Sequence, residues 1–246
     1  MLLACLGSFV GLLIGITGVG GGILAVPLLV LATGRPMLDC VGTALFFSAI
    51  VKSYATLQYY FYKSIDGPVL GRLVLGGLPG AVGGSILAQY FSATHTYKVL
   101  PKIVGGIVAV TAGITLLRRP HARPPSSHRS GLVTFFAYFI GVEIGFSAAG
   151  SGALGSMLLF NMTTLAPAKV VGTDLAFGLA LSLAGAFVHV SMGHWRPELV
   201  APFGLGGLCG AFWGTSLARI LPATLMRRIV LIAAIILGFG LVAQGI

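Results

Sequence analysis

Apolar residues occur along this chain in long continuous runs separated by short polar intervals. Several runs approach or exceed the roughly 20 residues that a helix needs to cross the hydrocarbon core of a bilayer. Because the runs are continuous rather than alternating, they predict helices and not barrel strands. We therefore expect an all-α polytopic membrane protein. The eight runs are Met1–Ala32, Val41–Tyr62, Val69–Phe91, Val99–Leu117, Gly131–Thr163, Val171–Met192, Leu199–Leu221 and Ile229–Ile246.

Composition supports lipid as the main solvent. Hydrophobic residues make up 57% of the chain and charged residues 8%, whereas soluble domains carry about 25% charged residues. The first run lacks a basic leader and a small-residue cleavage site, so we expect it to be retained in the mature protein. The net charge of +10 either marks cytoplasmic loops or attracts an anion. Basic loops are ordinary in inner-membrane proteins, so we expect no nucleic-acid partner.

A shift of 130 residues aligns the chain with itself without a gap. The tripeptide "VGT" at Val41–Thr43 recurs at Val171–Thr173, and "LGGLPGAVGG" from Leu75 recurs as "LGGLCGAFWG" from Leu205. Such internal repeats are common in transporters, and the small residues of the longer motif favour close helix packing. The expected domains are a first transmembrane repeat at 1–117, a basic Pro-rich cytoplasmic linker at 118–130, and a second repeat at 131–246.

The first run of each half is interrupted by glycine, in "GITGVGGGILAVP" (15–27) and "GFSAAGSGALGSM" (145–157). A helix break within lipid frees backbone groups that must be buried in protein or face a wet cavity. We expect short helices after the breaks, at about 23–31 and 153–163, with Pro27 in a first turn, where it is tolerated. Their N-termini carry partial positive charge, so two of them converging near the midplane predict an anion site.

The residues predicted to bind this anion are small or carry donors. Glycine lets the backbone approach a ligand closely, and Lys52, in mid-span, could attract an anion or pair with a carboxylate. Thr43 and Thr173 could cap a helix or donate hydroxyls. The predicted binding set is Gly20, Gly21, Gly22, Thr43, Lys52, Ser147, Gly150, Ser151, Gly152 and Thr173.

Three residues are candidates for carrying a coupling proton. Asp174 and Glu143 could hold a proton or neutralise Lys52, and Asp174 could instead cap a helix N-terminus. His189 could carry a proton or play a plain interfacial role, while the adjoining "HWR" at 194–196 resembles an interface anchor. No catalytic motif and no carboxylate-rich metal cluster is present. We therefore expect neither an enzyme nor a cofactor.

The orientation of the two halves depends on whether the broken run crosses the membrane once. With the 118–130 linker in the cytoplasm, parallel halves place seven basic residues on each side. Inverted halves place ten inside and four outside. Because cytoplasmic loops are enriched in Lys and Arg, the count favours an inverted repeat, with eight hydrophobic runs making about eight to ten membrane segments.

The opening "GITGVGGGILAVPLL", the repeated "VGT" and the segment "GGLPGAVGG" resemble the TauE/SafE family of sulfite exporters, also described as toluene-sulfonate uptake permeases. The resemblance covers nearly the whole chain. It implies an inner-membrane secondary transporter for sulfite, related small sulfur oxyanions or organosulfonates. The family's glycine motif falls on Gly18, Gly20, Gly21, Gly22 and Pro27. Its second copy has Met157 where the first has Pro27.

Other functions stay open at this stage. A passive anion channel could use the same donors, and a membrane enzyme acting on lipids is disfavoured by the scarcity of acids. An exporter could use the inward-negative potential to expel an anion, whereas an uptake system must import a compensating proton or cation. The expected partners are thus a small anion, the lipid bilayer and a coupling ion, and the sequence leaves open a homodimer.

Overall fold

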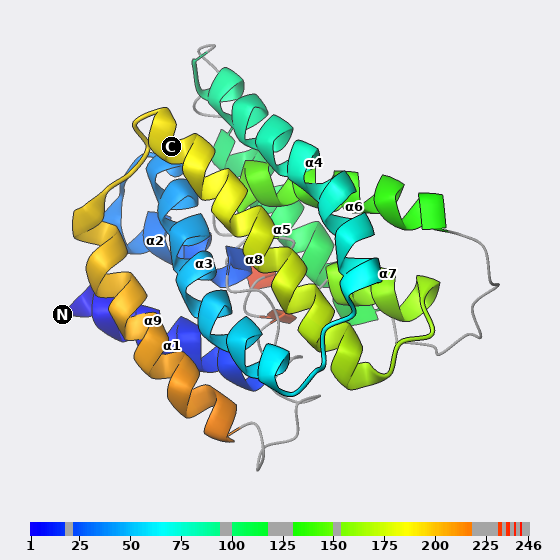
Figure 1. Ribbon diagram of the computed structural model, residues 1–246. Coiled ribbons are helices and arrows are strands. Elements are labelled where there is room, and N and C mark those ends of the chain that lie inside the picture. The colour runs from blue at the N-terminus through cyan, green and yellow to red at the C-terminus, as the bar shows by residue number, and fades with distance from the viewer. Residues whose placement is uncertain are drawn as a thin grey trace.

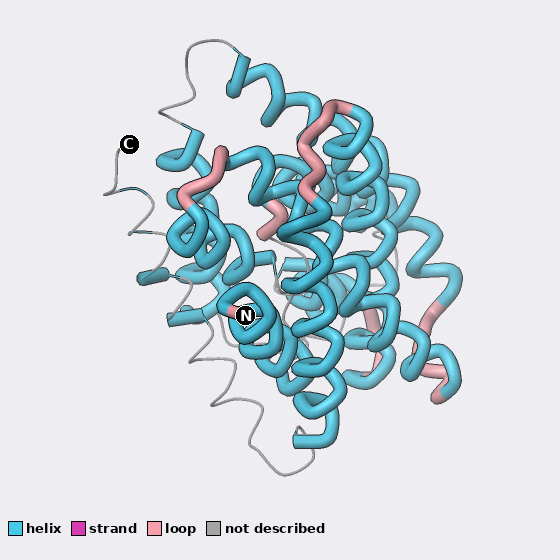
Figure 2. The backbone as a smooth tube through the Cα atoms, turned by 90° about the vertical axis from the view of Figure 1, so that its left-hand side faces the viewer, coloured by secondary structure: helices cyan, strands magenta, loops and turns pink. Residues whose placement is uncertain are grey.

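The structure is a computed structural model that describes residues 1–17, 22–93, 100–117, 130–149 and 154–217, with six positions between 231 and 242. Regular structure in these residues is entirely helical (Figure 1). Short loops join the helices, and no strand is drawn in the described part of the chain (Figure 2). This confirms the predicted all-α class.

Nine helices lie within the described ranges. The first half holds four helices followed by a fifth, α5 (Leu100–Leu117), which leads to the linker. The described part of the second half holds four helices in the same order as the first four. They are α1 (Leu2–Thr17), α2 (Gly22–Thr33), α3 (Met37–Phe61), α4 (Gly67–Ala93), α5 (Leu100–Leu117), α6 (Ser130–Ser147), α7 (Leu154–Met162), α8 (Pro167–Ser191) and α9 (Pro197–Leu217).

Both broken runs are divided where the glycines predicted. Helix α1 ends at Thr17 and α2 begins at Gly22, while α6 ends at Ser147 and α7 begins at Leu154. The first-turn position expected for Pro27 is wrong, because Pro27 is the sixth residue of α2 and lies inside the helix. Proline has no N–H, so the carbonyl of Ile23 lacks its usual helical donor.

Helix bounds repeat at the 130-residue spacing found in the sequence. Helices α3 and α8 start and end at equivalent positions, and α1 and α6 end at equivalent positions. The turns after α3 and α8 are also equivalent: Lys63 and Gly193 both adopt positive φ, at 52° and 80°. In each turn this residue's N–H donates to a carbonyl three residues earlier. The two halves therefore build the same local structure from different side chains.

Glycine faces hold the outer helices together, and the contacts cross between the halves. Helix α1 packs on α9, and α6 packs on α4. A Cβ at Gly210 would overlap the carbonyl oxygen of Ser8, and one at Gly80 would overlap that of Tyr138, which is the equivalent contact. In lipid, small residues let backbones approach closely and gain dispersion contacts. The packing role predicted for the two "LGGL" stretches is the one observed.

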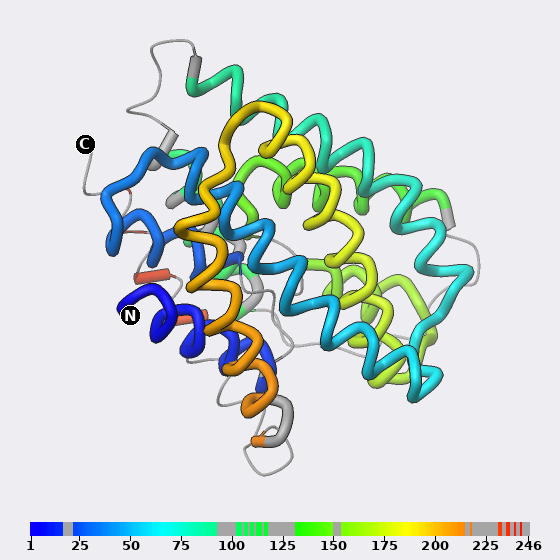
Figure 3. Tube along the Cα trace, turned by 60° about the vertical axis from the view of Figure 1, so that its left-hand side comes forward, coloured from blue at the N-terminus to red at the C-terminus, as the bar shows by residue number. Residues whose placement is uncertain are grey.

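Helices α3 and α8 cross at the centre of the bundle and run in opposite directions (Figure 3). The β-carbon position of Gly42 meets His189 and that of Gly185 meets Leu45, whereas Gly172 lies near Tyr59. The "VGT" glycines explain part of this arrangement. A Cβ at Gly42 would overlap the His194 carbonyl, and one at Gly172 would overlap the equivalent Ser64 carbonyl. The glycine of each motif thus leaves room for a turn to pack against it: the turn after α8 packs at Gly42, and the turn after α3 packs at Gly172.

Three of the described helices are long and apolar enough to cross a membrane, namely α3, α8 and the 67–92 portion of α4. Helices α1, α2 and most of α6 are apolar but shorter. Large aromatic side chains such as Phe135, Phe187 and Trp213 are exposed on the outside of the bundle. Such a surface is unsuited to water and suited to lipid.

The effect of a glycine-to-alanine substitution on stability should depend on whether that glycine contacts a neighbouring helix. We expect Gly80→Ala to lower stability by about 1–3 kcal/mol, because the new methyl group forces α4 away from α6. Gly83→Ala is the matched control, since a Cβ there meets none of the described atoms within 4 Å. Thermal unfolding of both variants in the same detergent measures the difference. Equal midpoints would contradict the close packing of α4 on α6.

Candidate functional site

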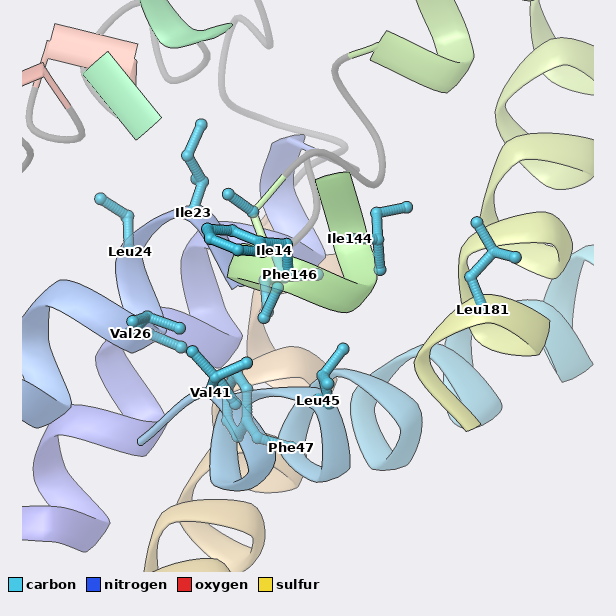
Figure 4. Packing of buried hydrophobic residues seen from close by; sticks show 14 of the residues in the cluster. Ile14, Ile23, Leu24, Val26, Val41, Leu45, Phe47, Ile144, Phe146 and Leu181 are labelled. Atoms are coloured by element: carbon cyan, nitrogen blue, oxygen red, sulfur yellow. The ribbon is translucent and has the colours of Figure 1, made fainter. Parts of the chain in front are cut away.

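The two helix breaks meet inside the protein. Gly22, the first residue of α2, is buried, and a Cβ on it would overlap the carbonyl oxygen of Ala148, which follows α6. Ile14 and Ile23, on either side of the first break, belong to the same buried apolar cluster as Phe146 before the second (Figure 4). Glycine at position 22 is thus required by a direct approach of one break to the other.

The N–H groups of Ala148 and Ala149, at the second break, are both hydrogen-bonded within the protein. Ala148 has a φ of 59° and donates its N–H to the Ile144 carbonyl at 2.8 Å, which is the geometry of a left-handed helix end. The N–H of Ala149 donates to the Ser147 hydroxyl at 3.2 Å, and that hydroxyl donates to the Glu143 carbonyl. Ser147 therefore supports the break, and its proton is already donated to the helix.

A polar stripe lies buried in the middle of the α3–α8 pair. Lys52 is 1% exposed, and its equivalent by the 130-residue repeat is Ser182. The antiparallel pairing of the two helices places both near the midpoint of the crossing. Ser48 lies one turn before Lys52, on the same face of α3. The hydroxyls of Ser48 and Ser182 are buried and find no hydrogen-bond acceptor or donor among the described residues.

Asp174 joins this stripe to the second break. It lies two turns before Ser182 on α8, is 3% exposed, and its charge attracts that of Lys52. Ser156, in the first turn of α7, donates its hydroxyl to the Asp174 carboxylate. The predicted capping of its own helix is wrong, because Asp174 is the eighth residue of α8 and Ala166 holds the N-cap position.

Thr43 and Thr173 do not come together. Thr43 donates its hydroxyl to the Asp39 carbonyl within α3 at 2.7 Å. Thr173 accepts the N–H of Asp66 at 3.0 Å, at the start of α4. The two threonines lie near opposite ends of the α3–α8 pair, and neither caps its own helix. Their repeated motif therefore serves helix packing. Thr173 holds Asp66, whose own carboxylate caps α4 by accepting the Val69 N–H at 3.1 Å.

Glu143 borders a cavity of about 410 Å³ between α6 and α7. The lining is mostly apolar, with aromatic rings from Phe136 and Phe139, and Asn161 adds one amide. A carboxylate at the edge of an apolar cavity disfavours an anionic ligand there. This cavity is therefore a poor candidate for the anion site, although it adjoins the second break.

His189 is buried, so the plain interfacial role is wrong. Its side chain lies inside the protein with Nε2 3.4 Å from the Gly145 carbonyl oxygen. Sequence reasoning also missed Asp39, which is 3% exposed and accepts from Arg196 Nε at 2.9 Å and interacts with His194 Nδ1 at 3.1 Å. The hydrogen bond and charge of Asp39 raise the pKa of Arg196, so the guanidinium stays charged.

Several predicted residues lie outside the described ranges. These are the glycines and the serine at the centres of the two breaks, and no contact is assigned to them. They are Gly18, Gly20, Gly21, Gly150, Ser151 and Gly152. Of the predicted binding residues, the structure brings Gly22 to the second break, where Ser147 also lies, and it brings Lys52 to Asp174.

Comparison with known protein sequences identifies the family of this chain. The family described as sulfite exporter TauE/SafE matches residues 3–241. The chain belongs to the TauE/SafE family. It is 28% identical to probable membrane transporter protein YjnA of Bacillus subtilis, over 96% of each chain, and 25% identical to YunE of the same organism, over 100% of this chain and 98% of YunE. No solved structure matches the chain significantly.

Probable membrane transporter protein ORF9 of Sinorhizobium sp. is 26% identical over 92% of this chain and 85% of its own length. The names of these relatives and of the family describe membrane transporters and no enzymatic activity. The TauE/SafE chain described here is accordingly a membrane transporter and not an enzyme. The buried charges in its central helices therefore belong to a transport protein.

The charges of Lys52 and Asp174 should be thermodynamically coupled. We expect Lys52→Gln and Asp174→Asn each to destabilise the protein, because each leaves the other charge buried without its counter-charge. The double variant should be more stable than the sum of the single effects by about 0.5–3 kcal/mol. Unfolding of the four proteins in detergent completes the cycle. Additive effects would show that the two charges act independently.

Proposed function

We propose that this TauE/SafE protein is a secondary transporter that moves sulfite, related small sulfur oxyanions or organosulfonates across the inner membrane. The observation that carries the proposal is the buried polar stripe at the centre of the α3–α8 pair. It combines one cation, Lys52, with two hydroxyls that have no partner among the described residues, those of Ser48 and Ser182. Ionisable groups at such depth usually mark a substrate path.

The chemistry of the stripe suits a small oxyanion. An ammonium group and hydroxyl donors can bind sulfonate or sulfite oxygens without a metal. The break glycines would complete the site by presenting backbone N–H groups from the start of α2 and α7. In this proposal the substrate contacts Lys52 and the break residues Gly20, Gly21, Gly22, Gly150, Ser151 and Gly152, and Ser147 holds the second break in place.

Asp174 gives the site a means of coupling. An anion bound near Lys52 would also lie close to the Asp174 carboxylate, and like charges repel strongly where water is excluded. Substrate binding would therefore favour the protonated form of Asp174. An anion and a proton would then be bound together, so that a pH gradient can drive transport. Glu143, one turn before the second break on α6, is a second candidate for the same role.

We further propose that residues 1–117 and 131–246 are inverted repeats joined by the basic linker at 118–130. Equivalent helices α3 and α8 run antiparallel, as an axis in the membrane plane requires. Helix α3 is about 37 Å long, enough to cross the bilayer. The parallel arrangement would place Arg35 and Arg196 on opposite sides, yet Asp39, one turn from Arg35, binds Arg196.

Flux into proteoliposomes tests the transport function. Purified protein should move sulfite saturably, and an imposed pH gradient should change the rate. We expect Lys52→Gln to weaken apparent affinity at least about tenfold, or about 1.4 kcal/mol, and Lys52→Arg to keep part of it. Lys102→Gln, at an exposed position of α5, is the matched control.

The same assay separates the alternatives. Flux that ignores the pH gradient and far exceeds transporter turnover would identify a passive channel. Transport of an organosulfonate in place of sulfite would keep the mechanism and change the substrate. Folded protein that moves sulfite, sulfate and organosulfonate no faster than empty vesicles would refute the proposed function.

Cysteine labelling tests the inverted repeat. After Cys5, Cys40 and Cys209 are replaced by alanine, single cysteines are introduced as Arg35→Cys or Ala166→Cys. These positions are exposed at opposite ends of the α3–α8 pair. A membrane-impermeant maleimide should label them from opposite faces of the membrane.

Two further positions provide the internal check on this experiment. Met192→Cys should label from the same face as Arg35→Cys, and Tyr62→Cys from the same face as Ala166→Cys. Labelling of Arg35→Cys and Ala166→Cys from one face would restore parallel halves.

A further inference from the structure

Two imidazoles lie next to each other at the C-terminal end of α8, close to Asp39 of α3 and Arg196 of the following turn. The rings of His189 and His194 are 6.3 Å apart between centroids, and the turn is held by the His194 N–H, which donates to the His189 carbonyl at 2.9 Å. His189 is 2% exposed, whereas the side chain of His194 is 23% exposed. The pair therefore extends from the surface of the turn into the interior.

Hydrogen bonding determines which nitrogens carry protons. The Gly145 carbonyl can only accept, so Nε2 of His189 must donate to it. The Asp39 carboxylate likewise accepts from Nδ1 of His194. The remaining nitrogens, Nδ1 of His189 and Nε2 of His194, are both buried and find no partner within the described ranges. In the neutral rings each of these nitrogens is an acceptor, so each ring can take up one added proton.

The described groups around this pair carry both signs of charge. Among the described residues, the charged groups that face it are Asp39 of α3 and Arg196 of the turn. Glu198, in the first turn of α9, acts on Arg196. Asp39 offsets the charge of an imidazolium, and helix α6 contributes the Gly145 carbonyl, which also accepts from the Ser85 hydroxyl at 3.2 Å. That carbonyl lies one turn before Ala148, at the second break.

The opposite end of the α3–α8 pair has no such arrangement. The positions equivalent to His189 and His194 are Tyr59 and Ser64, and those equivalent to Asp39 and Arg196 are Lys169 and Asp66. The backbone hydrogen bond of the turn is kept, since the Ser64 N–H donates to the Tyr59 carbonyl at 3.0 Å. The frame is thus shared by both ends, and the imidazoles belong to one end alone.

We propose that His189, His194 and Asp39 form a proton-binding site that connects the aqueous face at the α8–α9 turn with the second helix break. The inference rests on the proposed function and names the route by which its coupling proton travels. A proton enters through the partly exposed turn and binds the buried Nε2 of His194. Asp39, which also pairs with Arg196, stabilises the resulting imidazolium. The same proton then passes, directly or through one water molecule, to Nδ1 of His189. His194 returns to its neutral form, and the charge now lies beside the break.

The test compares proton and sulfite movement in the same proteoliposomes. An internal pH dye reports protons, and labelled sulfite reports substrate. We expect His189→Gln and His194→Gln to lower the ratio of protons to sulfite at least about tenfold and to flatten the pH dependence of transport. Glutamine keeps one hydrogen-bond donor but cannot gain a proton near neutral pH. The matched controls Tyr59→Phe and Ser64→Ala, at the equivalent positions, should keep the wild-type ratio.

Contrary outcomes are distinct. A wild-type ratio in both histidine variants would overturn the proton site and leave the transport function intact. Loss of all sulfite movement in folded histidine variants, with the controls active, would assign the pair to structure and overturn the proposal. If the wild type moves no sulfite, the proposed function fails. Proton binding is then judged by nitrogen NMR of the histidines, where absence of titration near neutral pH would refute it.

Discussion

Every backbone polar group within lipid must find a partner inside the protein, and this requirement explains the centre of the structure. A chain that interrupts two helices inside a membrane protein exposes backbone N–H and C=O groups that lipid cannot satisfy. In the described part of the chain, the two breaks lie against each other, with Gly22 close to the Ala148 carbonyl. At the second break, a left-handed Ala148 and the Ser147 hydroxyl satisfy the following N–H groups. The outer glycine faces serve the same end, because only close helix packing can enclose two breaks.

The framework is symmetrical in its backbone and asymmetrical in its charges. Equivalent glycines admit equivalent carbonyls on both sides of the α3–α8 pair. The ionisable residues do not follow this pattern. The positions of the second half equivalent to Lys52 and Asp39 hold Ser182 and Lys169, and the position of the first half equivalent to Asp174 holds Ala44. Packing constrains the contact glycines of both halves in the same way, because a methyl group at Gly42 or at Gly172 would overlap the carbonyl of the opposite turn. Charge is free to differ, so each end of the helix pair can hold different chemistry.

The sequence predicted the backbone better than the side-chain partners, for a physical reason. Hydropathy and glycine content depend on local residues, so the breaks at Thr17 and Ser147 and the repeat of α3 in α8 were predictable. The partners of Asp174 and His189 depend on which helices cross and in which direction, and hydropathy does not encode this. Capping was a reasonable expectation for Asp174 because a carboxylate near an apolar run often begins a helix. Here the helix starts seven residues earlier, at Pro167, and the carboxylate turns to α7 instead. The role of Asp39 was not predictable from the local sequence, because its partners lie more than 150 residues away along the chain.

One buried cation and one buried carboxylate in the same helix pair restrict what can be transported together. In a medium of low dielectric constant, a net charge costs several kcal/mol more than a neutral pair. With Lys52 and Asp174 both ionised, the empty site is close to neutral. Adding a singly charged anion leaves one excess negative charge, which a proton on Asp174 removes. The site is therefore neutral both when it is empty and when it holds the anion and the proton together. A site that holds only the anion or only the proton carries a net charge, and that charge is costly to bury. In the proposed mechanism, coupling between anion and proton follows from this electrostatic balance. The Asp174 carboxylate, which accepts a hydrogen bond from Ser156 of α7, lies close to the second break.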